Sequence, residues 1–272
     1  MAGYSTCPLD PGRKVRLLEE RLSQSLSILL LHGDPEARLL ANAAGALQAA
    51  LPHCAVKVTS AWATRPDLLA RDAAPLPASL CRHGLLPDAD VRDLVEERYQ
   101  LVVLSLLAGV VVPVLRCTDG GAFVAHHGLR ARWSAEDAEA IAAKCVEEPF
   151  MSPSTAATMM EPIINRLQDS GAAVAICTTF RHVREPLEHR RAEGPPSLRE
   201  LIRRCNLEAA RVSRRTGCFV LDLDRLFAQM GGAALGADCW GGGERAAELA
   251  LDELMALLFD AVPDAAMPAD PT

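Results

Sequence analysis

A short apolar run that passes directly into a Gly-Asp-Pro turn is the feature that most constrains how this chain folds. Residues 27–31 (SILLL) have the continuous apolar character of a strand buried on both faces. Gly33 permits a tight turn, Asp34 can cap a following helix, and Pro35 suits its first turn. A strand that leads at once into a helix places Gly33 and Asp34 at the carboxyl edge of a parallel sheet, where α/β proteins build their sites.

The bulk composition narrows the class of protein. The chain has 272 residues and is 50% hydrophobic but only 4% aromatic, so its core is built mainly from Ala, Leu and Val. This composition favours helices packed on a Val/Leu sheet, with enough chain for one large domain. The net charge of −7 provides no basic field for nucleic acid or anionic lipid. The arginines within 199–215 are therefore interpreted as a solvated helix face.

The cysteine pattern predicts reduced thiols. Nine cysteines are scattered along the chain with no Cys-x-x-Cys pair. An odd number at irregular spacing favours a reducing compartment. The first residues lack the apolar segment of a secretory signal, and no run is long enough to span a bilayer. We therefore expect a cytoplasmic protein without a membrane partner.

Five strands alternating with helices predict a three-layer α/β/α fold around a five-stranded parallel sheet. The expected strands are 27–32, 53–60, 99–107, 172–178 and 218–223. The expected helices are 14–26, 36–51, 88–98, 134–148, 154–170, 198–216, 225–230 and 244–259. Two strand-like runs within 110–124, around Asp119-Gly120-Gly121, predict a β-hairpin insertion.

Local signals add three expectations about where helices begin and end. Pro162 should bend the helix 154–170 or make it restart, because proline lacks the N–H that a helix interior needs. Gly217 should stop the helix 198–216, and Asp224 should cap the short helix 225–230. We divide the chain into an N-terminal arm and lead-in helix (1–26), one α/β domain (27–260) and a disordered tail (261–272).

Three segments of this chain resemble the blocks of the SGNH/GDSL hydrolases. HGD at 32–34 is similar to the Gly-Asp-Ser block that follows the first strand of that family. YQLVVLSLLAG at 99–109 is similar to the buried strand that runs into the family's Gly-x-Asn-Asp turn. The late helix, strand and short helix at 198–227, followed by LGADCWGGGERAAELALDEL, occupy the place of the last blocks. The resemblance implies a flavodoxin-like sheet and hydrolysis or transfer of acyl groups on small molecules, lipids or sugars.

The chain departs from the family at the positions that would carry serine-esterase chemistry. Pro35 stands where the family has its serine nucleophile, and proline provides neither a hydroxyl nor an N–H for an oxyanion hole. Residues 106–109 lack the asparagine of the third block, and Asp238 is followed three residues later by Gly241 instead of histidine. The glycine expected after the second strand is also absent. Standard Ser-His-Asp catalysis is therefore not expected.

Polar residues at the predicted strand ends are the remaining candidates for a site. Asp34 is either a site carboxylate or the cap of its helix, and we favour the cap. Ser105 could donate a hydrogen bond to a ligand or be a buried residue bonded to backbone. Cys177 could be a nucleophile beside His182, although its position in the strand favours a core thiol.

The loop after the fourth strand contains the densest polar group at a strand end. Thr178, Thr179, Arg181 and His182 could bind a carboxylate, phosphate or sugar, or could be ordinary surface-loop residues. Asp238 and Trp240 lie in a glycine-rich loop that could cradle a ligand or form a tight helix entry. His126-His127 lacks a third ligand at metal spacing, and no phosphate-binding glycine motif is present, so no metal or cofactor is expected.

Two functions remain open from the sequence. One is an SGNH-like esterase or acyltransferase for an acylated small molecule or glycan, with a rearranged site drawn from Asp34, Ser105, Cys177, His182 and Asp238. The other is a non-catalytic member of the fold whose ligand-binding residues include Gly33, Thr178, Thr179, Arg181 and Trp240. The substrate and the oligomeric state are not indicated by the sequence.

Overall fold

The computed structural model contains a three-layer α/β/α core built on a five-stranded parallel sheet. It describes residues 15–16, 18–19, 22, 25–32, 34–62, 99–111, 114–118, 122–124, 133–179, 197–230 and 243–261. The strands of this sheet are β1 (Ser25–His32), β2 (Ala55–Trp62), β3 (Leu101–Ser105), β7 (Ala173–Cys177) and β8 (Phe219–Leu221). Their spatial order is β2-β1-β3-β7-β8, and every pair is parallel. This is the flavodoxin-like order, which confirms the predicted fold class.

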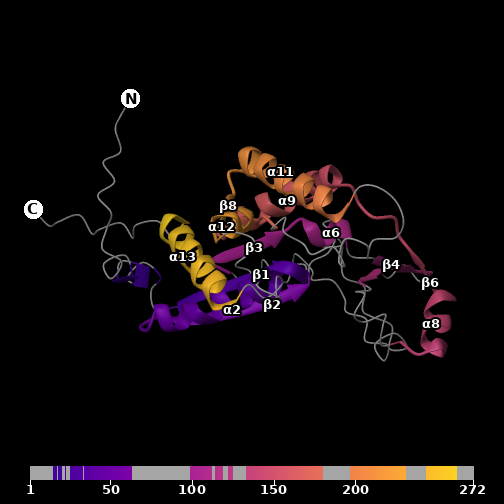
Figure 1. Cartoon of the computed structure of the whole chain (residues 1–272), viewed down its shortest axis with the longest axis horizontal. Coiled ribbons are helices and arrows are strands. Elements are labelled where there is room, and N and C mark those ends of the chain that lie inside the picture. Colours follow the sequence, from indigo (N-terminus) through magenta and orange to yellow (C-terminus); the bar gives the residue numbers. More distant parts are fainter. Residues whose placement is uncertain are drawn as a thin grey trace, which may run out of the picture.

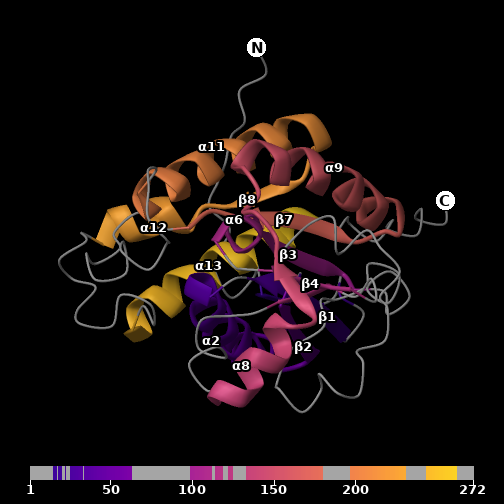
Figure 2. The same cartoon turned by 90° about the vertical axis from the view of Figure 1, so that its right-hand side faces the viewer.

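The alternation of side chains along the strands divides the core into two clusters. Val102 and Leu104 of β3 point to the face covered by α6 (Leu107–Val111), α9 (Pro153–Asp169) and α11 (Leu198–Thr216). Leu101 and Val103 point to the opposite face, covered by α2 (Asp34–Ala50), α12 (Leu223–Met230) and α13 (Gly243–Ala261). Figure 2 shows α9 and α11 above the sheet and α2 and α13 below it. All five residues of β3 are buried, as a central parallel strand requires.

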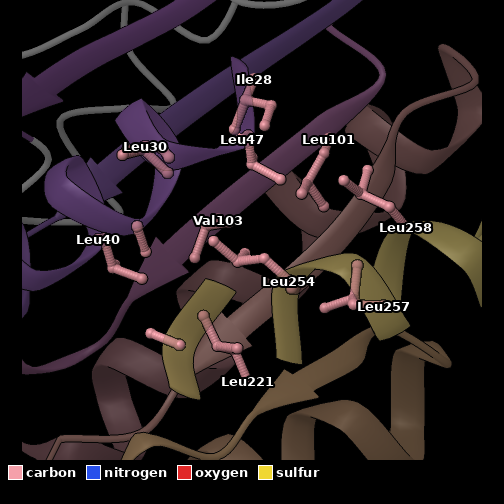
Figure 3. Packing of buried hydrophobic residues seen from close by; sticks show 14 of the residues in the cluster. Ile28, Leu30, Leu40, Leu47, Leu101, Val103, Leu221, Leu254, Leu257 and Leu258 are labelled. Carbon is pink, nitrogen blue, oxygen red and sulfur yellow. The ribbon is translucent and has the colours of Figure 1, made fainter. Parts of the chain in front are cut away.

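Leucine side chains fill the layer between the sheet and the pair α2 and α13. In Figure 3, Ile28, Leu101 and Val103 project from the strands toward Leu47 of α2 and Leu254 of α13. Each of these side chains is at most 1% exposed. Burying one such side chain stabilises the fold by roughly 1.5–3 kcal/mol. The low aromatic content is thus compensated by close packing of aliphatic residues.

A second, antiparallel sheet interrupts the chain between β3 and α9. It contains β4 (Val114–Cys117), β5 (Ala122–Val124) and β6 (Cys145–Glu147) in the order β5-β4-β6, with α8 (Ala135–Ala142) between β5 and β6. The pairing of β4 with β5 confirms the predicted hairpin, although residues 107–111 form a short helix before it. Figure 1 shows this insertion beyond the carboxyl ends of the central strands, toward the right of the view.

Several sequence predictions need correction. Residues 134–148 are not one helix, because the chain turns at Ala143 and Lys144 and then pairs β6 with the open edge of β4. Of the two outcomes predicted for Pro162, the restart is wrong and the bend stays a prediction: α9 is continuous, and the carbonyl that loses its helical donor belongs to the exposed Thr158, where water can solvate it. The cap of α12 is Asp222 and not Asp224, because Asp222 Oδ1 accepts the N–H of Arg225 at 3.1 Å.

Other predicted segments are confirmed within a few residues, or lie outside the described part of the chain. The helix 198–216 and its stop at Gly217 agree with α11, and the other described helices and strands are shifted by only a few residues at their ends. Residues 15–16 and 18–19 are helical, and β1 begins at Ser25, so the lead-in helix ends earlier than expected. The loop 63–87 and the helix expected at 88–98 lie outside the described residues. Within the described residues, no helix combines the length and apolarity needed to cross a membrane.

The cysteines agree only in part with the expectation of reduced thiols. Cys54, Cys177, Cys205 and Cys218 are free and buried. Cys145 is disulfide-bonded, so the prediction of reduced thiols is wrong for this residue. Burial raises the pKa of the Cys218 thiol, and burial together with the Glu19 carboxylate raises the pKa of Cys54. Both thiols therefore stay protonated and weakly nucleophilic at neutral pH.

One glycine that ends a helix and one inside a helix allow a matched test of backbone conformation. Gly217 ends α11 at φ 74°, and its N–H donates to the carbonyl of Ser213 at 2.8 Å. Gly45 is exposed inside α2, and a β-carbon added to either glycine would meet no atom from elsewhere in the described chain within 4 Å. Gly217→Ala should therefore lower the free energy of unfolding by about 1–2 kcal/mol through left-handed strain alone. Gly45→Ala should raise it by about 0.5–1 kcal/mol, because alanine favours a helix interior. Urea unfolding checks both, and changes of the same sign would contradict this account.

Candidate functional site at the carboxyl edge of the sheet

Three strands of the parallel sheet end in one row. Ser105 of β3 lies opposite Cys177 of β7, and Cys177 lies opposite Leu221 of β8. Among the described residues, the buried polar side chains are Ser105 (2% exposed), Thr178 (6%) and Thr179 (2%). All three lie at the carboxyl ends of β3 and β7. A buried polar group is costly unless it is hydrogen-bonded, so their concentration here marks this edge as the polar region of the core.

Thr178 connects the end of β7 to the start of α12. Its hydroxyl donates to Asp222 Oδ1 at 2.9 Å and accepts the backbone N–H of Asp224 at 3.0 Å. Its own backbone N–H donates to the carbonyl of Leu221 at 3.0 Å. Asp222 in turn caps α12 through the N–H of Arg225. The Thr178 hydroxyl and the Asp222 carboxylate thus hold the ends of β7 and β8 next to the N-terminus of α12.

Thr179 is held by Asn206 from the middle of α11. The N–H of Thr179 donates to Asn206 Oδ1 at 2.9 Å, and Asn206 Nδ2 donates to the carbonyl of Thr179 at 2.8 Å. This pair of bonds satisfies both backbone groups of a residue that has just left the sheet. Sequence reasoning missed Asn206. The sequence does contain one hint of its role. Asparagine is a poor helix former, so an asparagine in the middle of an amphipathic helix indicates that its amide has a specific partner.

Cys177 and Ser105 have different surroundings from the two threonines. Cys177 is a free thiol, 3% exposed, and belongs to the core cluster that includes Val103 and Leu221 on the α2 and α13 face. This position is typical of a packing residue. Ser105 closes β3 immediately before α6 and is buried at the same edge.

The other predicted site residues are placed only in part. Asp34 is the first residue of α2 and follows the last residue of β1 by two positions, so its backbone lies at the carboxyl end of that strand. Gly33 lies outside the described residues. The same is true of Arg181 and His182 in 180–196 and of Asp238 and Trp240 in 231–242. The proposed pairing of Cys177 with His182 therefore stays a prediction, as do the roles of the other four.

The arginine-rich surface of α11 is extensively ion-paired. Arg204 contacts Glu200 at 2.8 Å, and Arg211 contacts Glu208 at 2.6 Å. Arg215 reaches across to Glu161 of α9 at 2.5 Å. The arginine side chains of these pairs are about half exposed, so each pair adds little to stability, but together they neutralise much of the positive charge of the helix. Within the described residues, no cluster of three or more His, Cys, Asp or Glu side chains could hold a metal ion.

Comparison with known proteins adds structural neighbours but no sequence relative. No family model matches the sequence, and no curated protein matches it. An acetylxylan esterase from Geobacillus stearothermophilus is 9% identical with a TM-score of 0.48, covering 86% of this chain and 94% of its own. TesA is 14% identical with a TM-score of 0.45, covering 86% and 99%. A protein named as a GDSL-like lipase from Parabacteroides merdae is 7% identical with a TM-score of 0.48, covering 86% and 95%. These scores are too low for the neighbours to carry an argument, so the fold assignment rests on the strand order.

The bond between Thr178 and Asp222 can be tested by removing only the hydroxyl. Thr178→Val keeps the shape of the side chain but leaves the Asp222 carboxylate and the Asp224 N–H without this partner. The free energy of unfolding should fall by about 1–3 kcal/mol. Thr158→Val is the matched control, because the Thr158 hydroxyl bonds to the carbonyl of Ser154 on an exposed helix turn. The control should change stability by less than about 0.5 kcal/mol. If both changes lower the free energy of unfolding equally in urea, the hydrogen bonds of Thr178 at the sheet edge add no more stability than an exposed helix bond does.

Proposed function

We propose that this chain is an SGNH/GDSL hydrolase-like protein that binds an acylated small molecule or glycan at the carboxyl edge of its parallel sheet. The observation that carries this proposal is the gathering of buried polar side chains, Ser105, Thr178 and Thr179, at that edge. In open α/β sheets, ligands bind in the crevice beyond the carboxyl ends of the strands. The similarity of HGD at 32–34 to the first SGNH block supports the same location.

The acyl chemistry would need a nucleophile other than the residue after Asp34. Pro35 follows Asp34, so the family's usual serine is replaced by a residue without a hydroxyl. An esterase or acyltransferase of this kind would use a side chain from the set Asp34, Ser105, Cys177, His182 and Asp238. His182 is the natural general base of this set, because an imidazole titrates near neutral pH. Removing a general base costs about 10²–10⁴-fold in rate.

A second candidate is a protein that binds the same class of ligand without catalysis. Two observations favour it. The Thr178 hydroxyl and Asp222 Oδ1 are already hydrogen-bonded within the fold, and Cys177 is packed in the core. A rigid edge with internally satisfied groups can recognise a ligand through the neighbouring loops without attacking it. A cytoplasmic location stays a proposal: among the described residues, the four free cysteines favour a reducing compartment, whereas the disulfide of Cys145 favours an oxidising one.

Ester turnover distinguishes the two functions. Purified wild type should hydrolyse p-nitrophenyl acetate above the buffer rate, and His182→Ala should lower kcat/KM by at least about 100-fold. His53→Ala is the matched control, because His53 is exposed at the opposite end of the sheet, before β2. It should leave the rate unchanged.

The remaining variants locate the nucleophile. Loss of activity in Cys177→Ala would assign attack to that thiol, and retention would assign it to another member of the set. Wild type that is silent on p-nitrophenyl and naphthyl esters and on acetylated xylo-oligosaccharides would overturn the hydrolase proposal. A rise in Tm with those oligosaccharides would then support the binding function. A Pro35→Ser variant that gains turnover would show that the edge still accommodates an ester.

A further inference from the structure

The disulfide of Cys145 can be explained by the way the strands of the insertion pair. Of the cysteines within the described residues, Cys54, Cys177, Cys205 and Cys218 are free, and Cys145 is disulfide-bonded. Cys117, the last residue of β4, is the remaining one. The pairing of β4 with β6 puts Cys117 directly opposite Cys145.

The ladder between β4 and β6 places these two residues at a position suited to a cross-strand link. The N–H of Thr118 donates to the carbonyl of Lys144 at 2.9 Å, and the N–H of Glu148 donates to the carbonyl of Val114 at 2.9 Å. Hydrogen-bonded and non-hydrogen-bonded pairs alternate along an antiparallel ladder, so Cys117 and Cys145 form a non-hydrogen-bonded pair. In such pairs the Cα atoms are about 4.5 Å apart, within the range of about 4.4–6.8 Å that disulfides span.

We propose that Cys117 and Cys145 form a cross-strand disulfide that fastens β6 to β4 and closes the segment 118–144 into a covalent loop. A small-molecule disulfide such as oxidised glutathione is a sufficient oxidant. One cysteine thiolate attacks it and releases one glutathione thiolate, giving a mixed disulfide. The second cysteine thiolate then attacks the protein sulfur of that mixed disulfide, forming the Cys117–Cys145 bond and releasing the second glutathione. Two protein thiols are oxidised, and one glutathione disulfide is reduced to two thiols.

The link matters because the strands of the insertion are short. The strands β4, β5 and β6 are only four, three and three residues long, and a small sheet of such strands is marginal without further support. The ion pair between Arg116 and Glu148 is a second tie between β4 and the end of β6. Since the insertion leaves the core after β3 and returns at α9, the disulfide fixes a structure on the side of the molecule toward which the carboxyl ends of the central strands point (Figure 1).

Peptide mapping under non-reducing conditions tests the assignment. The protein is incubated with oxidised glutathione, its free thiols are alkylated in denaturant, and it is digested with trypsin. Trypsin cleaves after Arg116, Arg130, Lys144 and Arg166. Cys117 is then in the peptide 117–130, and Cys145 is in the peptide 145–166. We expect these two peptides to be joined and to separate on reduction. Full alkylation of both cysteines, or Cys145 joined to a different cysteine peptide, would overturn the proposal.

Limited proteolysis tests the role of the link in the folded protein. Reduction of wild type should accelerate cleavage within 118–144 about tenfold, because the closed loop restricts local opening. Cys117→Ser should be cut at the fast rate with or without reductant, whereas the control Cys54→Ala should respond to reductant like wild type. Cleavage of wild type that is indifferent to reductant would contradict a role for the disulfide in fastening the insertion. The result is independent of whether the edge is catalytic or only binds a ligand.

Discussion

Burial of the parallel sheet on both faces is the constraint on which the rest of this structure depends. β3 is enclosed completely, with Val102 and Leu104 packed under α9 and α11, and Leu101 and Val103 packed over α2 and α13. Polar side chains inside such a strand would have no water and few partners. They are therefore confined to the strand ends, which is where Ser105, Thr178 and Thr179 lie.

The carboxyl edge is organised by side chains that bond to backbone. Thr178 and Asp222 join the end of β7 to the first turn of α12, and Asn206 holds Thr179 from α11. Both helical layers are thereby connected to the same edge. A site built on these elements is preorganised, because its supporting groups are fixed before a ligand arrives. The same bonds also limit what Thr178 and Asp222 can offer to a substrate.

The helices with a clear amphipathic repeat and the alternation of strands and helices were predictable from the sequence, whereas a three-residue strand and side-chain contacts between distant residues were not. The helix 198–216 and its stop at Gly217 follow from an amphipathic repeat and a glycine, which act within a few residues. β6 is three residues long, and its strand conformation depends on β4. The contact of Asn206 with Thr179 spans 27 residues of sequence, so no local pattern reveals it. The capping role of Asp222 was missed because Asp224 is an equally plausible cap by sequence.

Amide hydrogen exchange followed by NMR tests most directly the claim that this edge is preformed and rigid. The N–H groups of Thr179 and Asp224 donate to side chains and not to neighbouring strands. If the network is as firm as the sheet, these two amides should exchange within about tenfold of those of Val174 and Ile176 in β7. Exchange of Thr179 and Asp224 at the rate of an unstructured peptide, with β7 still protected, would contradict the account.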